Sequence, residues 1–208
     1  MQNTVQLGTD QNISVEKIEG SYVVTLPNSY DVYWEFTQKS NNFGTFTKDK
    51  ASDPKKIIFS VPEEAINTDK AVSEFNSKVN QAKNFIKEIM KEKEDLEYII
   101  TFDKKQPGKD VTFLYKNPAN GFMVGEVIKS GKYFVALAAG ESADKTYVRV
   151  VHTNRLLNGK EDFANREQAI ADRFPVGAVK YLKFDNFGKV VAKDYEPSAK
   201  KKPAKIKQ

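Results

Sequence analysis

The sequence contains no cysteine and a single histidine, His152, among its 208 residues. The chain therefore forms no disulfide, and it lacks both the thiolate ligands of a zinc-thiolate site and a thiol nucleophile. A Ser-His-Asp triad is not expected, because no Gly-x-Ser-x-Gly motif accompanies the one histidine. His152 ends a predicted strand that includes residues 147–151, so we expect it at the rim or in the core of a sheet rather than in a catalytic site.

Long apolar runs are also absent, since no segment approaches the roughly 20 residues that a membrane-spanning helix requires. The first residues have neither the basic start nor the apolar stretch of a signal peptide. Residues 125–133 (GEVIKSGKY) fail as a phosphate-binding loop, because they have one residue too many between the glycines and tyrosine in place of serine or threonine. We therefore expect no enzymatic activity, metal, cofactor or membrane partner, and a location in the cytoplasm or in a virion.

The net charge of +5 is concentrated at the C-terminus. Residues 197–208 contain two prolines, one isoleucine and no acidic residue, a composition that predicts a disordered tail. The five lysines of this tail are Lys200, Lys201, Lys202, Lys205 and Lys207. A flexible lysine arm neutralises phosphates without sequence preference. A solubilising tail and an arm for an acidic protein partner are equally open interpretations.

Hydrophobic periodicity predicts an α+β fold with a mainly antiparallel sheet. A long amphipathic helix is expected over about residues 68–93, with Asn67 or Thr68 as its N-cap. A shorter helix is expected over about residues 161–174. The helical spacing of three and four residues recurs through Val72, Phe75, Val79, Ala82, Ile86 and Ile89. Turn residues and short apolar or alternating segments predict strands at residues 22–26, 30–37, 43–47, 57–61, 98–102, 111–115, 122–128, 133–138, 146–152, 179–184 and 189–192.

Four parts of the chain are expected. They are a flexible arm over residues 1–19, a β-rich module with the long helix over 20–116, a second small α+β module over 117–196, and the tail over 197–208. The boundary is placed at residues 117–121 because that segment, Asn-Pro-Ala-Asn-Gly, concentrates turn formers. Strands 98–102 and 111–115 are expected to form a hairpin. A single domain, in which both hairpin systems share one sheet, is the alternative.

Aromatic residues and lysines alternate in the segment 30–59. Sheets that bind single strands stack bases on exposed rings, with lysines along the backbone. The candidate nucleic-acid-binding residues are Tyr33, Lys39, Phe43, Lys48, Lys50, Lys55 and Lys56, together with the lysines of the tail. Packing of the rings in the core is the alternative, because residues 30, 32, 34 and 36 form one natural core face.

All four arginines lie in the second module, at positions 149, 155, 166 and 173. Guanidinium groups suit phosphate recognition, but acidic residues in the same stretch favour intramolecular ion pairs. Residues 125–157, a hairpin followed by Val-His-Thr-Asn-Arg-Leu, resemble small β-barrel modules of plasmid-encoded DNA-associated proteins. The resemblance includes no diagnostic motif and assigns no residue role.

These features predict a non-enzymatic binding protein of phage or plasmid type, with nucleic acid as its ligand. The alternative is a structural or assembly protein, such as a component of a virion or another complex, that binds other proteins.

Overall fold

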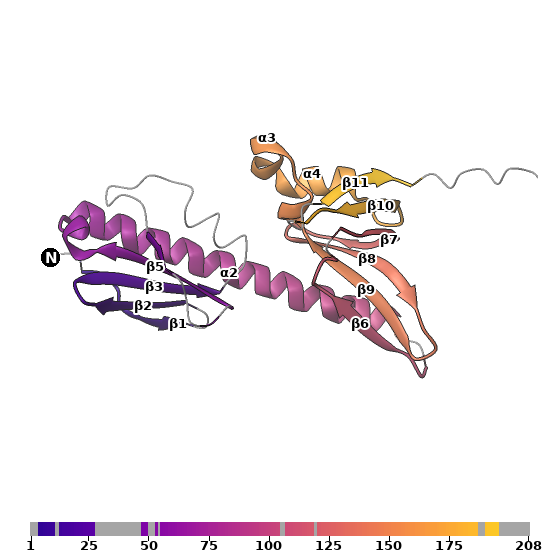
Figure 1. Cartoon of the computed structure of the whole chain (residues 1–208), viewed down its shortest axis with the longest axis horizontal. Helices are drawn as coiled ribbons and strands as arrows, with labels where there is room; N and C mark the ends of the chain where they lie inside the picture. The colour runs from indigo at the N-terminus through magenta and orange to yellow at the C-terminus, as the bar shows by residue number, and fades with distance from the viewer. Residues whose placement is uncertain are drawn as a thin grey trace, which may run out of the picture. The chain divides into compact units, whose positions relative to one another are not determined.

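The computed structural model describes residues 4–10, 13–27, 47–49, 53, 55–104, 107–118, 120–186 and 190–195. The chain divides into two compact units, Met1–Lys91 and Glu92–Gln208. Each unit contains a sheet, and the predicted α+β class with mostly antiparallel pairing is confirmed (Figure 1). The division falls within the long helix, whereas the sequence predicted a boundary at residues 117–121.

The N-terminal unit is built on a five-stranded antiparallel sheet of order β1-β2-β3-β5-β4. The strands are β1 (Gly8–Asp10), β2 (Ile13–Ile18), β3 (Ser21–Pro27), β4 (Thr47–Asp49) and β5 (Lys56–Pro62). Alternate residues along β2, β3 and β5 are buried on one face, as the period of two along a strand requires. The strands predicted at residues 22–26 and 57–61 are confirmed. The strand predicted at 30–37 lies outside the described residues.

The prediction of a flexible arm over residues 1–19 is wrong for its described part. Residues 8–10 and 13–18 form β1 and β2, and the side chains of Ile13 and Val15 are only 1% exposed. Only two core residues mark β2 in a polar stretch, which is too few for a periodicity signal. The strand is stabilised instead by antiparallel pairing with β3.

The long helix α2 (Asp69–Lys104) begins directly after Thr68, one of the two predicted N-cap residues. The Thr68 hydroxyl oxygen accepts a hydrogen bond from the N–H of Ala71 at 3.2 Å, so Thr68 acts as the N-cap. A short 3-10 helix, η1 (Glu63–Ile66), precedes it. The helix contributes the following residues to the core of the N-terminal unit: Ala71, Val72, Phe75, Val79, Ala82 and Ile86.

The helix is longer than predicted, and the strand predicted at residues 98–102 is wrong. Leu96 and Ile100 continue an apolar spacing of four and are buried, while Lys93 and Glu97 form an i,i+4 ion pair at 3.8 Å. The aromatic and β-branched residues there have strand propensity, but burial on one helical face outweighs it. Helix α2 ends shortly before Pro107, which cannot continue a helix.

The C-terminal unit contains a six-stranded sheet of order β11-β10-β7-β8-β9-β6. The strands are β6 (Asp110–Leu114), β7 (Phe122–Ser130), β8 (Phe134–Glu141), β9 (Lys145–His152), β10 (Val179–Phe184) and β11 (Val190–Asp194). Strand β6 pairs in parallel with β9, so the predicted hairpin of 98–102 with 111–115 is absent from the described residues. The other pairs are antiparallel, and the order β10-β7-β8-β9 is that of a Greek key.

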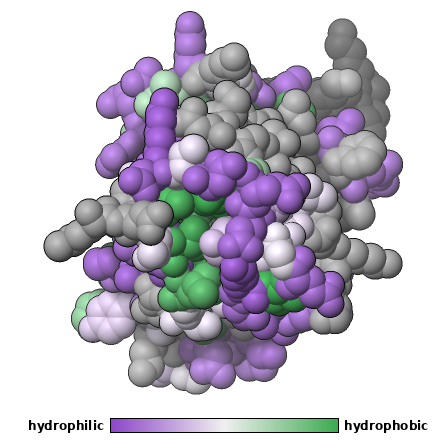
Figure 2. Space-filling model, turned by 90° about the vertical axis from the view of Figure 1, so that its left-hand side faces the viewer, coloured by the Kyte–Doolittle hydropathy of each residue, from purple (hydrophilic) through white to green (hydrophobic). Residues whose placement is uncertain are grey.

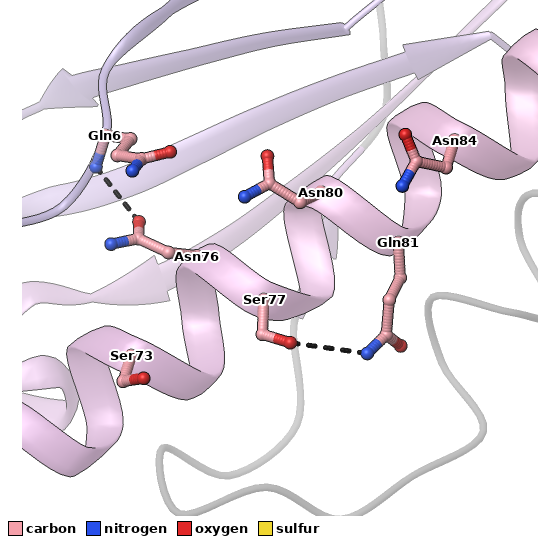
Figure 3. Close-up of a pocket in the computed structure, with 7 residues that line it drawn as sticks. All are labelled: Gln6, Ser73, Asn76, Ser77, Asn80, Gln81 and Asn84. Atoms are coloured by element: carbon pink, nitrogen blue, oxygen red, sulfur yellow. Dashed lines mark hydrogen bonds between the residues drawn. The ribbon is translucent and has the colours of Figure 1, made fainter.

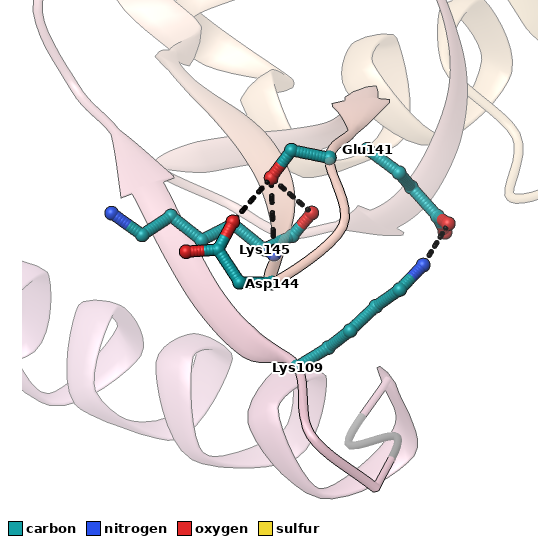
Figure 4. A network of polar contacts seen from close by, with 5 residues as sticks. Lys109, Glu141, Asp144 and Lys145 are labelled. Atoms are coloured by element: carbon teal, nitrogen blue, oxygen red, sulfur yellow. Dashed lines mark hydrogen bonds and ion pairs between the residues drawn. The ribbon is translucent and has the colours of Figure 1, made fainter.

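Polar contacts at the β8–β9 turn hold β6 beside β9 (Figure 4). Lys109, just before β6, reaches Glu141 at 2.7 Å, and this bond lowers the pKa of Glu141. The Ser142 hydroxyl donates to Asp144 at 2.9 Å and accepts from the N–H of Lys145 at 3.1 Å. The hydrogen bond from Ser142 lowers the pKa of the Asp144 carboxyl. The N–H of Asp110 then bonds to the carbonyl of Asp144 at 2.9 Å, which starts the parallel pairing.

One face of this sheet is covered by short helices that follow β9. These are η2 (Thr153–Arg155), α3 (Gly159–Ala164) and α4 (Arg166–Arg173). The single helix predicted over residues 161–174 is interrupted at Asn165, whose φ of −117° and ψ of 39° are not helical. The core beneath consists mainly of Val127, Val135, Leu137, Val151, Leu156, Leu157, Ile170, Phe174, Leu182, Phe184 and Val190.

Glu92 of α2 is bound to the β7–β8 turn of the same unit. Its Oε1 atom accepts hydrogen bonds from the N–H groups of Tyr133 at 2.7 Å and Phe134 at 3.0 Å. A Cβ atom at Gly131 would lie 2.4 Å from this oxygen, which explains the glycine in the turn. Bonds from backbone N–H groups to a carboxylate are stronger than neutral ones.

The substitution Glu92→Ala is therefore expected to destabilise the C-terminal unit by about 1.5–3 kcal/mol. Glu92→Gln, which keeps an acceptor oxygen, is expected to lose less. Hydrogen exchange followed by NMR checks this, with faster exchange at Tyr133 and Phe134 as the expected result. Glu94→Ala, on an exposed position of the same helix, is the control. Unchanged exchange at the turn in Glu92→Ala would refute the role of Glu92.

Candidate functional site

Most of the binding residues predicted from the sequence lie outside the described residues. These are Tyr33, Lys39, Phe43, Lys50, Lys200, Lys201, Lys202, Lys205 and Lys207. Lys48 belongs to β4, where it is aligned with Phe59 of β5. Lys55 and Lys56 are exposed at the start of β5. The structure thus places Lys48 and Lys56 on two neighbouring strands and Lys55 directly before one of them, and the binding role of these lysines stays a prediction.

The C-terminal unit carries another surface of aromatic residues and lysines, which sequence reasoning did not find. It is the face of β7, β10 and β11 that points away from the core, and we call it the outer face. Strand register arranges its residues in three rows, each crossing the three strands in that order. The rows are Phe122, Lys183 and Val191; Val124, Tyr181 and Lys193; and Glu126, Val179 and Tyr195.

Large apolar side chains of the outer face are exposed. The exposed fractions are 71% for Phe122, 52% for Val191 and 41% for Tyr195. The rings of Phe122 and Tyr181 are stacked, with centroids 5.9 Å apart and an interplanar angle of 23°. A contiguous exposed apolar surface of this kind marks an interaction site more often than an isolated exposed residue does.

The aromatic residues and the lysines follow two neighbouring diagonals of this grid. Phe122, Tyr181 and Tyr195 form one diagonal, and Lys183 and Lys193 form the next. Diagonal neighbours on a sheet are about 7–8 Å apart, so the aromatic diagonal is about 15 Å long. Glu126 occupies the corner on the opposite side from the lysines, so the positive charge lies along one edge of the aromatic diagonal.

Strand β10 explains why the sequence did not reveal this surface. Both of its faces carry large apolar residues: Leu182 and Phe184 point into the core, and Val179 and Tyr181 point outward. The only sequence signal is that the outward positions also include Lys183. The grid itself depends on the pairing of β10 with the distant β7, which the sequence does not specify.

On β8 and β9, the side of the sheet that points away from the helices is buried. Phe134, Ala136 and Val150 point away from the helical core of the unit, yet they are no more than 7% exposed. Leu96 and Ile100 of α2 are buried in the same unit. On this side of the six-stranded sheet, aromatic side chains are therefore exposed on β7 and directly after β11, half-buried on β10 and buried on β8.

His152 lies at the end of β9, as predicted, and caps η2. Its Nδ1 atom accepts a hydrogen bond from the N–H of Asn154 at 3.2 Å. Its ring contacts that of Phe134 edge-on, with centroids 5.0 Å apart. The contacts of His152 are therefore structural, and it is half-buried at the rim of the sheet.

Two of the four arginines form hydrogen bonds or ion pairs within the C-terminal unit. Arg173 forms an ion pair with Asp162 at 2.8 Å. The N–H of Asn158 and the guanidinium of Arg173 both hold the pKa of Asp162 below its usual value. Arg149 donates to the carbonyl oxygens of Leu114 and Lys116, and partial burial lowers its pKa. Their guanidinium groups are thus engaged within the C-terminal unit.

A pocket of about 420 Å³ lies beside β11 in this unit. Lys180, whose side chain is 8% exposed, bonds to Asp194 at 2.5 Å and lies 5.6 Å from the centre of the Phe174 ring. Arg173, a second cation of the lining, is exposed and is paired with Asp162. Lys180 and Arg173 thus already contact carboxylates, whereas Lys193, which also lines the pocket, is one of the exposed lysines of the outer face.

A second concavity, of about 480 Å³, lies on the N-terminal unit (Figure 3). Its lining side chains are uncharged amides and hydroxyls: Gln6, Ser73, Asn76, Ser77, Asn80, Gln81 and Asn84. Asn76 accepts from the N–H of Gln6 at 3.0 Å and donates to the carbonyl of Thr4 at 2.9 Å. This amide fixes the N-terminal segment against α2, which is a structural role.

The surface of the N-terminal unit shows one further apolar area. In Figure 2 hydrophobic residues gather in the middle of the face, framed by hydrophilic side chains. The exposed large hydrophobic residues described in this unit are Leu7, Ile18 and Met90.

Within the described part of the chain, no cluster of three acidic or histidine side chains could hold a metal ion. Nor is any described helix both long and apolar enough to cross a membrane.

Comparison of the chain with protein-family models, with curated proteins and with solved structures finds no match. The residues of the candidate site are therefore identified by their geometry and chemistry alone.

Proposed function

We propose that this chain is a non-enzymatic nucleic-acid-binding protein that acts in the cytoplasm or in a particle assembled there. The observation that carries the proposal is the outer face, where three aromatic rings and two lysines share one exposed sheet surface. Sheets that bind nucleic acid combine rings for base stacking with cations along the sugar-phosphate backbone. The outer face supplies both groups on neighbouring diagonals.

The lysine tail supports the same proposal through its position in the sequence. Lys200 follows Tyr195 by five residues, so the chain length limits it to about 18 Å from the outer face. Apart from the tail, the chain is close to neutral. Lys183, Lys193 and the tail would then provide the local positive charge that attracts phosphates.

The proposal rests on the outer face and not on the strand order. Five-stranded Greek-key barrels of the OB type bind oligonucleotides across their second and third strands. In the present Greek key these strands are β8 and β9, and the surface around Phe134 and Val150 is buried. Function is carried by sites rather than by folds.

Loss of the lysines is expected to weaken binding in a salt-dependent way. The double substitution Lys183→Ala/Lys193→Ala removes two phosphate contacts and should reduce the slope of log K against log salt by about 1.4–1.8. Deletion of residues 197–208 should reduce it further. Mobility shifts of labelled single- and double-stranded DNA over a range of salt concentrations measure both effects. Lys104→Ala, at the exposed end of α2, is the control. The proposal fails if micromolar protein shifts neither DNA at low salt.

A second candidate function is assembly with other proteins. It is favoured by Val124, Val179 and Val191, which are 40–52% exposed on the outer face and contribute nothing to phosphate binding. Size-exclusion chromatography with light scattering distinguishes the two functions. A stable oligomer that dissociates on Val191→Asp, in a protein that binds no DNA, would establish assembly instead.

A further inference from the structure

We infer that the outer face binds single strands in preference to duplexes, with unpaired bases stacked along Phe122, Tyr181 and Tyr195 and phosphates along Lys183 and Lys193. This inference rests on the proposed function and names its ligand class. Binding is expected to depend little on base sequence.

The preference for single strands follows from which parts of nucleic acid the rings can contact. In a duplex the flat faces of the bases are stacked on one another, and only their edges are accessible in the grooves. The Phe122 ring is stacked on that of Tyr181, yet Phe122 exposes 71% of its surface, so ring surface remains available for a base. Unpaired bases can stack on such rings, whereas paired bases cannot.

The spacing of the two diagonals fits one extended strand. Lys183 is directly opposite Phe122, and Lys193 is directly opposite Tyr181. Residues opposite each other have Cβ atoms about 4.5–5.5 Å apart. Each lysine can therefore reach a phosphate beside a base that is stacked on the neighbouring ring. Three rings over about 15 Å provide room for two or three bases, as on other sheet surfaces that bind single strands.

The composition of the outer face predicts weak base selectivity. The guanidinium and amide side chains of arginine, asparagine and glutamine, which form paired hydrogen bonds with base edges, are the main means of reading particular bases, although lysine and glutamate can also contact base edges. The nine residues of the outer face include none of these types. Stacking is tolerant of sequence because every base has an aromatic face.

Fluorescence anisotropy with the full chain tests the inference, with labelled 12-nucleotide oligo-dT, a mixed-sequence 12-mer and a 12-base-pair duplex as probes. Both single strands should bind more tightly than the duplex, with similar affinities for each other. Phe122→Ala and Tyr195→Ala should each weaken single-strand binding roughly 5- to 150-fold. Phe122→Tyr, which keeps a ring, should restore most of the affinity. Tyr98→Ala is the matched control, because Tyr98 is a 74% exposed aromatic residue of the same unit outside the outer face.

The possible results separate the inference from the function on which it rests. Equal or tighter duplex binding, with unchanged affinity in both alanine variants, would overturn the inference while the proposed function stands. No binding of any probe at low salt would overturn both. Circular dichroism of each variant confirms folding, and Phe122→Tyr keeps the test decisive if an alanine variant is unstable.

Discussion

Gly125→Ala is expected to unfold or severely destabilise the C-terminal unit. A Cβ atom at this position would lie 2.3 Å from the carbonyl oxygen of Ala138 on β8, and 3.0 Å from the terminal methyl of Met123. Real side chains do not approach a backbone oxygen so closely, so β7 and β8 would have to separate. Forcing an extra methyl into a packed site costs typically 1–3 kcal/mol, and we expect about 3 kcal/mol here because the neighbour is backbone.

The measurement is urea denaturation of Gly125→Ala, followed by circular dichroism and NMR. Glu126→Ala, at the next and exposed position of β7, is the control and should change stability by no more than about 0.5 kcal/mol. Oligonucleotide binding should be lost together with stability, because β7 carries Phe122 and Val124 of the outer face. A fully stable Gly125→Ala protein would show that the two strands are further apart than described.

Phe75→Ala is expected to have the largest effect on the N-terminal unit. Phe75 is 0% exposed at the centre of the α2–sheet core, and its ring lies 5.8 Å from that of Tyr22. Truncation of a buried phenylalanine costs about 3–5 kcal/mol, because contacts are lost and a cavity remains. Thermal unfolding measures the loss, with Ser73→Ala on the exposed side of the same helix as the control.

The two core variants should differ in their effect on binding. All nine residues of the outer face belong to the C-terminal unit, whereas Phe75 belongs to the N-terminal unit. Phe75→Ala should therefore retain single-strand binding at temperatures where the C-terminal unit remains folded. Loss of binding in this variant, with the C-terminal unit intact by NMR, would place part of the binding surface in the N-terminal unit.

Local signals in the sequence predicted much of the fold. Thr68 before a periodic apolar stretch identified the start of α2, and apolar segments bounded by turn residues identified β5 and the β7–β8 pair. Errors arose where tertiary contacts decide the conformation. Residues 98–102 have the composition of a strand but are helical, because Leu96 and Ile100 are buried on one helical face. Strand β2 contributes two core residues and becomes recognisable only through its pairing with β3.

The candidate site was less predictable than the fold. The sequence directed attention to aromatic residues near Tyr33 and to the lysine tail, neither of which lies within the described residues. The outer face combines residues from segments 122–126, 179–183 and 191–195. Each segment is recognisable as a strand, but their alignment depends on which strands pair. Which face of each strand is exposed depends on where α4 packs. Local periodicity encodes neither the strand pairing nor the exposed face.

NMR chemical-shift mapping with 12-nucleotide oligo-dT tests the proposed binding surface most directly. Titration into the labelled full chain should shift signals of outward residues in β7, β10 and β11, above all those of Phe122, Tyr181 and Tyr195. Signals of the amide-lined concavity around Asn80 should remain unchanged. Shifts confined to other parts of the chain, or no shift at low salt, would contradict the assignment of nucleic-acid binding to the outer face.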